Sequence, residues 1–253
     1  MLDLLLGLLD PVFYATFLLG LVSLVVAKLQ APILLKYGKT LPQSAGRHYS
    51  ESFWGQFQRL TVPKAWFSHF YVYSVFVSSV NMFLLQFNLL SILIAVHSAR
   101  RLYETVYVNV SKPSARIHVS HYLVGFWFYS AVNYAASTSS PETWSSLPVR
   151  CLALLLFALA SWDQHENHLH LSKLRKYTLP TYGLFRIVAS AHYFDEFLLY
   201  FALTLFTGAS AKLLVCLLWV IANLSFSAVE TRAWYLQKFT ESTPRFAILP
   251  YML

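Results

Sequence analysis

Residues 161–200 read SWDQHENHLHLSKLRKYTLPTYGLFRIVASAHYFDEFLLY and gather many polar side chains between two strongly apolar segments. Polar groups at membrane depth are costly unless they are paired or used in function. This contrast predicts a site for a polar, anionic ligand in a membrane protein. The polar residues are Asp163, Gln164, His165, Glu166, Asn167, His168, His170, Lys173, Arg175, Lys176, Arg186, His192, Asp195 and Glu196.

The composition of the whole chain indicates an integral membrane protein. Of its 253 residues, 57% are hydrophobic, 17% are aromatic and only 12% are charged. The mean hydropathy is +0.51, well above that of a soluble globular domain. A net charge of +8 can indicate nucleic acid as a partner, but no basic stripe is interleaved with exposed aromatic residues. We therefore expect no nucleic-acid partner and attribute the charge to one membrane face.

Seven apolar segments are long enough, or nearly so, to cross a bilayer as helices, which takes about 20 residues. The alternation of apolar and polar residues that is typical of strands is absent from them. We expect an all-α, seven-transmembrane helical bundle, with a turn marked by Asn81, Gln86 and Asn88 between the second and third spans. The segments are 12–27, 67–85, 87–108, 119–136, 147–164, 193–206 and 211–234.

The distribution of basic residues predicts the orientation of this bundle. If the spans alternate in direction, 17 of the 19 basic residues lie on one side, and only Arg150 and Lys212 lie on the other. The positive-inside rule places the richer side in the cytosol, so the N-terminus is expected in the lumen and the C-terminus in the cytosol. Residues 1–253 are interpreted as a single membrane-embedded domain, in which about 147–253 forms most of the ligand site.

Helical spacing places Gln164, His168 and Arg175 on one face of the fifth span. An amide, an imidazole and a guanidinium in this arrangement can hold ribose hydroxyls and phosphates, because the arginine fork matches phosphate oxygens. The alternative is a solvated helix end at the membrane interface. His165 and His168 lack the convergent carboxylate or cysteine ligands of a closed zinc site, so no metal is expected.

The third span carries His97, Arg101 and Glu104 on one face. Arg100 and Glu104 are four residues apart, so an ion pair with a purely structural role is an alternative to a functional site.

The start of the second span combines Lys64, His69 and Tyr71. Such residues near lipid headgroups are often interface anchors, which is the alternative to a catalytic role. Farther along, Pro180 and Gly183 break the helix and predict a loop that covers the ligand. Ser190 is a suitable N-cap for the sixth span.

Several stretches together resemble the steroid 5α-reductase family, most closely its polyprenal reductase branch. The resemblance implies a seven-helix enzyme of the endoplasmic reticulum membrane with an NADPH site facing the cytosol. The stretches are VPKAWFSHFY (62–71), HSARRLYETVYV (97–108), HYLVGFWFYS (121–130), SWDQHENHLHLSKLRKYTLP (161–180), LFRIVASAHYFDE (184–196), SAVETRAWYLQKF (227–239) and ILPYML (248–253).

The resemblance also implies roles for individual residues. The steroid-reducing members have Asp in place of His168 and Asn in place of His192, and both departures fit the polyprenal branch. Ser98 stands where those members have a Tyr that holds the substrate carbonyl, so the catalytic group stays open among His69, Tyr71, Tyr103 and Glu104. The implied cofactor-binding residues are Gln164, His168, Arg175, Tyr177, His192, Glu196 and Tyr235.

The implied reaction is NADPH-dependent reduction of the α-isoprene double bond of long-chain polyprenal to dolichal, in dolichol synthesis for protein N-glycosylation. The substrate tail would lie in membrane lipid, and no obligatory protein partner is inferred. Alternatives are a steroid or enoyl-CoA reductase, an isoprenylcysteine or phospholipid methyltransferase, and a non-enzymatic lipid-binding scaffold.

Overall fold

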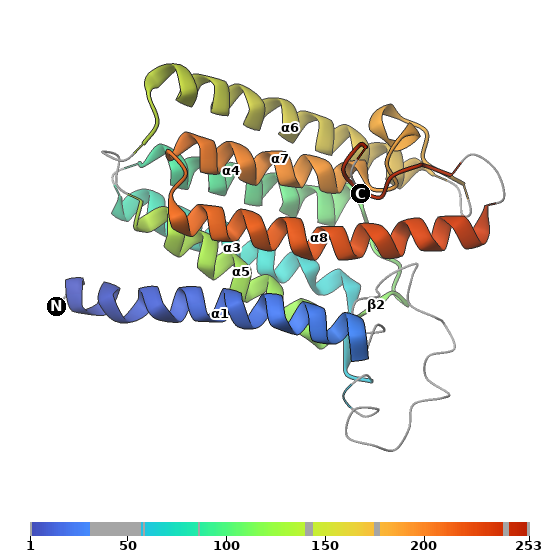
Figure 1. Cartoon of the computed structure of the whole chain (residues 1–253), viewed down its shortest axis with the longest axis horizontal. Coiled ribbons are helices and arrows are strands. Elements are labelled where there is room, and N and C mark those ends of the chain that lie inside the picture. Colours follow the sequence, from blue (N-terminus) through green and yellow to red (C-terminus); the bar gives the residue numbers. More distant parts are fainter. Residues whose placement is uncertain are drawn as a thin grey trace.

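Seven long helices run through the described part of the chain and form a bundle in which successive helices alternate in direction (Figure 1). The computed structural model describes residues 2–30, 57, 59–85, 87–139, 144–174, 178–239 and 243–251. Each long helix contains most of one predicted apolar segment, so the expected helical class is confirmed. The helices are α1 (Leu2–Gln30), α3 (Phe67–Leu84), α4 (Leu89–Tyr103), α5 (Val119–Ser137), α6 (Leu147–Lys173), α7 (Ala191–Phe206) and α8 (Ala211–Lys238).

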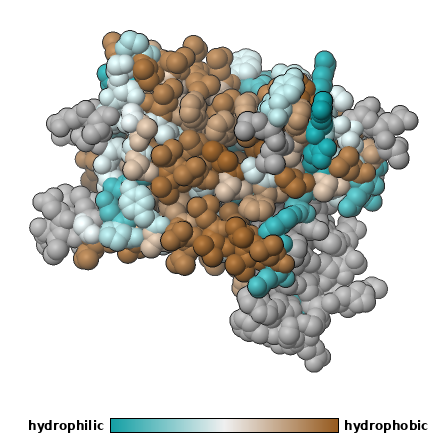
Figure 2. Space-filling view, in the orientation of Figure 1, coloured by the Kyte–Doolittle hydropathy of each residue, from teal (hydrophilic) through white to brown (hydrophobic). Residues whose placement is uncertain are grey.

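The surface of the bundle is that of a membrane protein. Within the described residues, length and hydropathy mark three helical stretches as able to cross a membrane, Gly7–Gln30, Leu147–Lys173 and Ala211–Lys238. Large apolar side chains are exposed along them, and hydrophobic residues cover the middle of the face in Figure 2. Since α4 and α7 have only 15 and 16 residues, seven complete crossings stay a prediction.

The break between α3 and α4 lies where it was predicted. Phe87 has a positive φ of 62°, and the Asn88 side chain caps α4 by accepting a hydrogen bond from the Leu90 backbone N–H at 2.8 Å. Asn81 does not belong to this turn. It lies inside α3, where its side-chain amide donates to the Asn133 carbonyl of α5 at 3.0 Å, because a buried amide requires a partner.

Two short strands, which the sequence did not predict, close one end of the bundle. β1 (Thr61–Pro63) pairs antiparallel with β2 (Arg116–His118), with Thr61 opposite His118. Three residues are too few for an alternating pattern to be recognised. His118 also caps α5, since its Nδ1 accepts from the Ser120 backbone N–H at 3.2 Å, and its Nε2 lies 2.9 Å from the Phe57 carbonyl and donates to it.

Aromatic side chains fill the interior, and two glycines let helices approach closely. A Cβ at Gly125 in α5 would lie 2.5 Å from the Phe70 ring of α3. A Cβ at Gly20 in α1 would lie 2.7 Å from the Trp219 ring of α8. Both positions therefore require the absence of a side chain.

Polar contacts join α1 to α8 at both ends of the bundle. Lys28 lies 2.6 Å from Glu230, and Lys212 lies 2.9 Å from Asp10. The first pair lies at the end where α1 stops and the second at the end where α1 starts (Figure 1). The two ion pairs therefore join α1 to α8 near both ends of α1.

The C-terminal segment returns to the start of α7. Val188 and Phe246 form a parallel β-bridge, and the Ser190 backbone N–H donates to the Ala247 carbonyl at 3.1 Å. Ala247 and Ile248 are buried in this contact. The segment therefore holds the entrance to α7, which carries part of the polar site.

Candidate active site

A fully buried carboxylate, Glu104, lies at the centre of a polar network where α4 ends. Arg100 Nη1 donates to its Oε1 at 2.5 Å, and Arg101 Nη1 donates to its Oε2. Nδ1 of His168 lies 2.7 Å from Oε2, and Nδ1 of His165 lies 3.1 Å from Oε1. The predicted contact between Arg100 and Glu104 is thus present. It is one of four side-chain contacts to this carboxylate, whereas a simple ion pair has only one.

Gln164 connects this network to α7. Its Oε1 accepts from Arg100 Nη2 at 2.5 Å, and its amide nitrogen donates to Glu196 Oε2 at 2.6 Å and to the His192 carbonyl at 2.9 Å. On the other side of Glu196, Nε2 of His97 lies 3.3 Å from Oε1. Two guanidinium groups and two carboxylates are therefore held together across α4, α6 and α7, which lets buried charges compensate one another.

Local helix geometry explains why these side chains converge. Gln164 and His168 are one turn apart on α6, and His192 and Glu196 are one turn apart on α7, so each pair projects from one face. At Glu104 the α-helix widens into a π-helical segment, η4 (Glu104–Val108). Such widened turns are rare and often occur at functional sites.

Tyr71 of α3 adds a phenol to the network. Arg101 Nη2 donates to its hydroxyl oxygen at 3.1 Å, and the guanidinium lies 5.4 Å from the ring centroid. Because the phenol oxygen accepts from Arg101, its own proton stays available for another acceptor. Tyr71 can therefore donate a hydrogen bond to a carbonyl oxygen placed beside the network.

The structure brings together six of the predicted site residues. They are Tyr71, Glu104, Gln164, His168, His192 and Glu196. The rings of His168 and His192 are 5.4 Å apart. Arg175 and Tyr177 lie outside the described residues.

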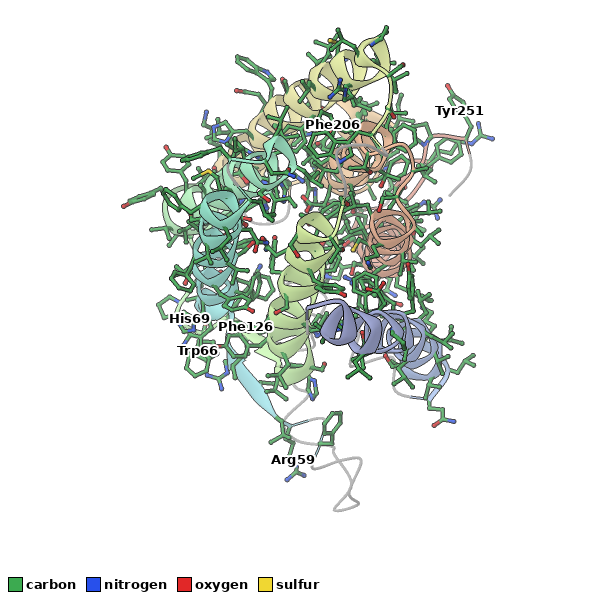
Figure 3. All side chains as sticks on the ribbon, turned by 90° about the vertical axis from the view of Figure 1, so that its left-hand side faces the viewer. Arg59, Trp66, His69, Phe126, Phe206 and Tyr251 are labelled. Carbon is green, nitrogen blue, oxygen red and sulfur yellow. The ribbon has the colours of Figure 1, made fainter. Side chains whose placement is uncertain are left out.

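The other three predicted residues lie elsewhere. His69 is exposed at the edge of the bundle beside Trp66, with its Nδ1 3.1 Å from the Tyr122 hydroxyl (Figure 3). Tyr103 lies at the outer edge of the network, where it is 52% exposed and packs against the rings of Tyr107 and His165. Tyr235 is buried in α8 and packs against Trp234 and Phe239. Their proposed roles stay predictions, and the location of His69 and Tyr103 disfavours them relative to Tyr71 and Glu104.

Sequence reasoning did not select Arg100 and Arg101 as site residues. Their spacing of four and three residues from Glu104 indicated contacts with that carboxylate. It did not indicate that Arg100 would also contact Gln164 and Arg101 would also contact His168 on α6. Asn167 was also missed as a partner of α7. Its amide nitrogen donates to Asp195 Oδ2 at 2.7 Å, while its buried Oδ1 has no hydrogen-bond partner within the described residues.

The segment before α7 is only partly as predicted. Gly183, with φ of 48°, starts a short 3₁₀ helix, η6 (Gly183–Arg186), which places Phe185 in the interior. Ser190 occupies the N-cap position of α7, but its side chain makes no capping hydrogen bond. Its backbone N–H instead donates a hydrogen bond to the Ala247 carbonyl of the C-terminal segment. Among the described residues, no group of His, Cys, Asp or Glu side chains is arranged to hold a metal ion.

Comparison with known proteins connects this geometry to a family of reductases. The family model for 3-oxo-5-alpha-steroid 4-dehydrogenase matches residues 112–253. A polyprenal reductase of Saccharomyces cerevisiae is 38% identical over 239 residues, covering 94% of this chain and 93% of its own. A polyprenal reductase of Drosophila melanogaster is 28% identical over 281 residues, covering 85% and 86%. These similarities extend over most of the chain, on both sides of the polar network.

Proposed function

Because this chain belongs to the 3-oxo-5-alpha-steroid 4-dehydrogenase family of oxidoreductases that act on CH–CH groups, we propose that its substrate is polyprenal. The reaction would be NADPH-dependent reduction of the α-isoprene double bond to give dolichal, in dolichol synthesis for protein N-glycosylation. Two observations support this substrate: the similarity to polyprenal reductases and an exposed apolar surface suited to a membrane-dissolved tail.

The observation that carries the proposal is the contact between Arg101 and Tyr71. When bound, NADPH supplies the hydride that the β-carbon of the conjugated aldehyde receives, and negative charge then develops on the carbonyl oxygen. The Tyr71 hydroxyl donates a hydrogen bond to that oxygen. Arg101, whose Nη2 donates to the phenol oxygen at 3.1 Å, polarises the O–H group and makes it a stronger donor. A proton from water then adds to the α-carbon, which completes the saturated bond.

The donor and acceptor groups around Gln164 suit a nicotinamide cofactor. A carboxamide presents one acceptor and two donors. Glu196, whose Oε2 accepts from the Gln164 amide at 2.6 Å, keeps further lone pairs that can accept from such donors. Oδ1 of Asn167 is a buried acceptor with no partner within the described residues. We assign cofactor contacts to Gln164, His168, His192 and Glu196, and, from the family resemblance, to Arg175, Tyr177 and Tyr235.

We further propose that the entire chain, residues 1–253, is one reductase domain in the membrane of the endoplasmic reticulum. The end of the bundle that contains the polar network would face the cytosol, with the N-terminus in the lumen. The position of the polar network beyond the apolar middle of α6, and the excess of basic residues on that side, support this orientation. An NADPH site at this end would be reached from the cytosol.

The test is reduction of polyprenal by the purified full-length chain, with product analysis by mass spectrometry. We expect consumption of NADPH and a product heavier by two hydrogens. Replacement of Tyr71 by Phe should lower kcat about 100-fold, since one donor to the developing oxyanion is lost, while the affinity for NADPH is retained. The matched control is Tyr73→Phe, because the Tyr73 hydroxyl is 2.7 Å from Ser130 instead.

Other outcomes would contradict the proposal. Reduction of a 3-oxo-Δ4 steroid but not of polyprenal would place the chain with the steroid reductases. Methyl transfer from S-adenosylmethionine, without NADPH oxidation, would remove the reductase assignment. Equal kcat values for Tyr71→Phe and Tyr73→Phe would show that Tyr71 is not the hydrogen-bond donor to the substrate carbonyl.

A further inference from the structure

Two buried tyrosines on the apolar side of the polar network have unused hydroxyl groups. Tyr129 of α5 is 6% exposed and Tyr200 of α7 is 3% exposed. Within the described residues, neither hydroxyl has a hydrogen-bond partner. The oxygen atoms are nevertheless not completely enclosed by protein atoms.

Two half-buried tyrosines in the bundle, Tyr73 and Tyr134, differ in this respect. The Tyr134 hydroxyl donates to Asp10 at 2.6 Å, and that of Tyr73 lies 2.7 Å from the Ser130 hydroxyl. Buried hydroxyl groups are normally hydrogen-bonded, because leaving them without a partner in apolar surroundings is unfavourable. Two such groups in one region therefore indicate an acceptor that a ligand supplies.

The two tyrosines adjoin the polar network directly. The Tyr129 ring lies 5.6 Å from that of Tyr71, and the Tyr200 ring lies 6.0 Å from that of His97. The pair thus borders the groups assigned to the cofactor and to the carbonyl.

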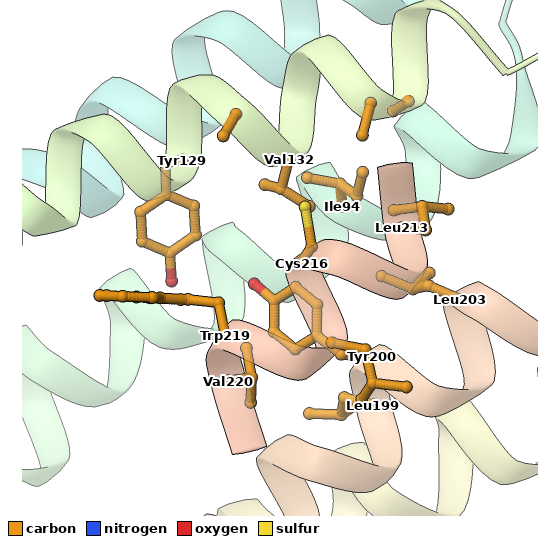
Figure 4. Packing of buried hydrophobic residues seen from close by; sticks show 14 of the residues in the cluster. Ile94, Tyr129, Val132, Leu199, Tyr200, Leu203, Leu213, Cys216, Trp219 and Val220 are labelled. Carbon is orange, nitrogen blue, oxygen red and sulfur yellow. The ribbon is translucent and has the colours of Figure 1, made fainter. Parts of the chain in front are cut away.

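The orientation of the side chains places both hydroxyls in the same interior region. Figure 4 shows the hydroxyls of Tyr129 of α5 and Tyr200 of α7 both directed toward the Trp219 side chain of α8. The surrounding wall is apolar and includes Val132, Cys216 and Trp219. A ligand that fits this region has one polar oxygen at the tyrosines and an apolar body.

We propose that Tyr129 and Tyr200 donate hydrogen bonds to the carbonyl oxygen of the substrate, together with Tyr71. This inference rests on the proposed function in requiring a conjugated carbonyl lipid. Both O–H groups are free to donate, since no acceptor within the described residues competes for them. As charge develops on the oxygen, these hydrogen bonds strengthen.

The first measurement compares full-length Tyr129→Phe, Tyr200→Phe and the double variant with the Tyr73→Phe control. Kinetics are recorded with NADPH and either polyprenal or a 3-oxo-Δ4 steroid, which carries the same conjugated carbonyl. We expect each single variant to lower kcat about 10- to 100-fold for whichever substrate the wild type reduces. NADPH affinity and the apparent Tm should match those of the control.

The second measurement does not depend on turnover. The full-length protein is loaded with NADP⁺, which cannot reduce the substrate, and with polyprenal labelled with ¹³C at the carbonyl. Hydrogen bonds lower the stretching frequency of the bound carbonyl, so infrared spectra should show a higher frequency in each Phe variant than in the wild type. Tyr73→Phe should leave the frequency unchanged. The steroid, labelled at its carbonyl carbon, is measured in the same way.

The outcomes separate this inference from the proposed function. Reduction of the steroid but not of polyprenal would contradict polyprenal as the substrate. The kcat and carbonyl frequency of the tyrosine variants would then be compared with the steroid as ligand. Folded Tyr129→Phe and Tyr200→Phe proteins with unchanged carbonyl frequency and kcat within twofold of the control would overturn the role of the tyrosine pair. A wild-type spectrum without a shifted carbonyl for either ligand would overturn it as well.

Discussion

Replacing Glu104 by Gln is the sharpest test of the buried network. The substitution keeps the shape of the side chain but removes the charge that Arg100 and Arg101 share, while Glu104 itself is fully buried. Leaving a buried charge without its partner typically destabilises a protein by about 3–5 kcal/mol. The two Arg side chains are 16% and 17% exposed, and each keeps other contacts, so we expect about 3 kcal/mol.

Thermal unfolding in detergent measures this effect. For a chain of this size, 1 kcal/mol corresponds to about 2–4 °C, so the apparent Tm should fall by about 6–12 °C. The matched control is Asp10→Asn, which also converts an acid to its amide. Asp10 is 42% exposed beside Lys212, and a pair this accessible contributes at most about 1 kcal/mol.

A rescue variant distinguishes loss of charge from loss of shape. Combining Glu104→Gln with Arg100→Met removes one of the unpaired cations, so part of the lost Tm should return. If the apparent Tm of Glu104→Gln lies within about 2 °C of that of Asp10→Asn, the difference corresponds to about 1 kcal/mol or less. That result would refute the stabilising role assigned to the buried Glu104 charge. Further loss in the double variant would show that Arg100 stabilises the fold independently of Glu104.

Two further predictions concern packing and pH. Gly125→Ala should lower stability by about 1–3 kcal/mol, because its Cβ would lie 2.5 Å from the Phe70 ring, whereas Gly7→Ala meets nothing within 4 Å and should leave Tm nearly unchanged. Equal Tm values for these two variants would contradict the close contact. Burial lowers the pKa of His118, although its hydrogen bond to the Phe57 carbonyl opposes the shift. The unfolded chain therefore binds more protons below the ordinary pKa of about 6.5, and stability should fall as the pH drops through this value. His118→Gln should flatten that dependence between pH 7 and 5, and an unchanged slope would exclude His118 as its source.

The sequence alone determined the helices and some of their faces. Long apolar runs predict helices because a chain in lipid must satisfy its backbone hydrogen bonds internally. Asn88 marked the break before α4 through its preference for the N-cap position. The helical period placed Gln164 with His168, and Arg100 with Glu104, because these pairs are close in the chain.

Only the tertiary structure decided which faces meet. His69 and Tyr71 are two residues apart in α3, yet Tyr71 contacts Arg101 while His69 is exposed. In a soluble protein a polar outer face would distinguish them, but lipid is as apolar as the protein interior, so this contrast is lost. For the same reason, the inward orientation of Tyr129 and Tyr200 follows from the packing of α5, α7 and α8 and from no pattern within any one helix.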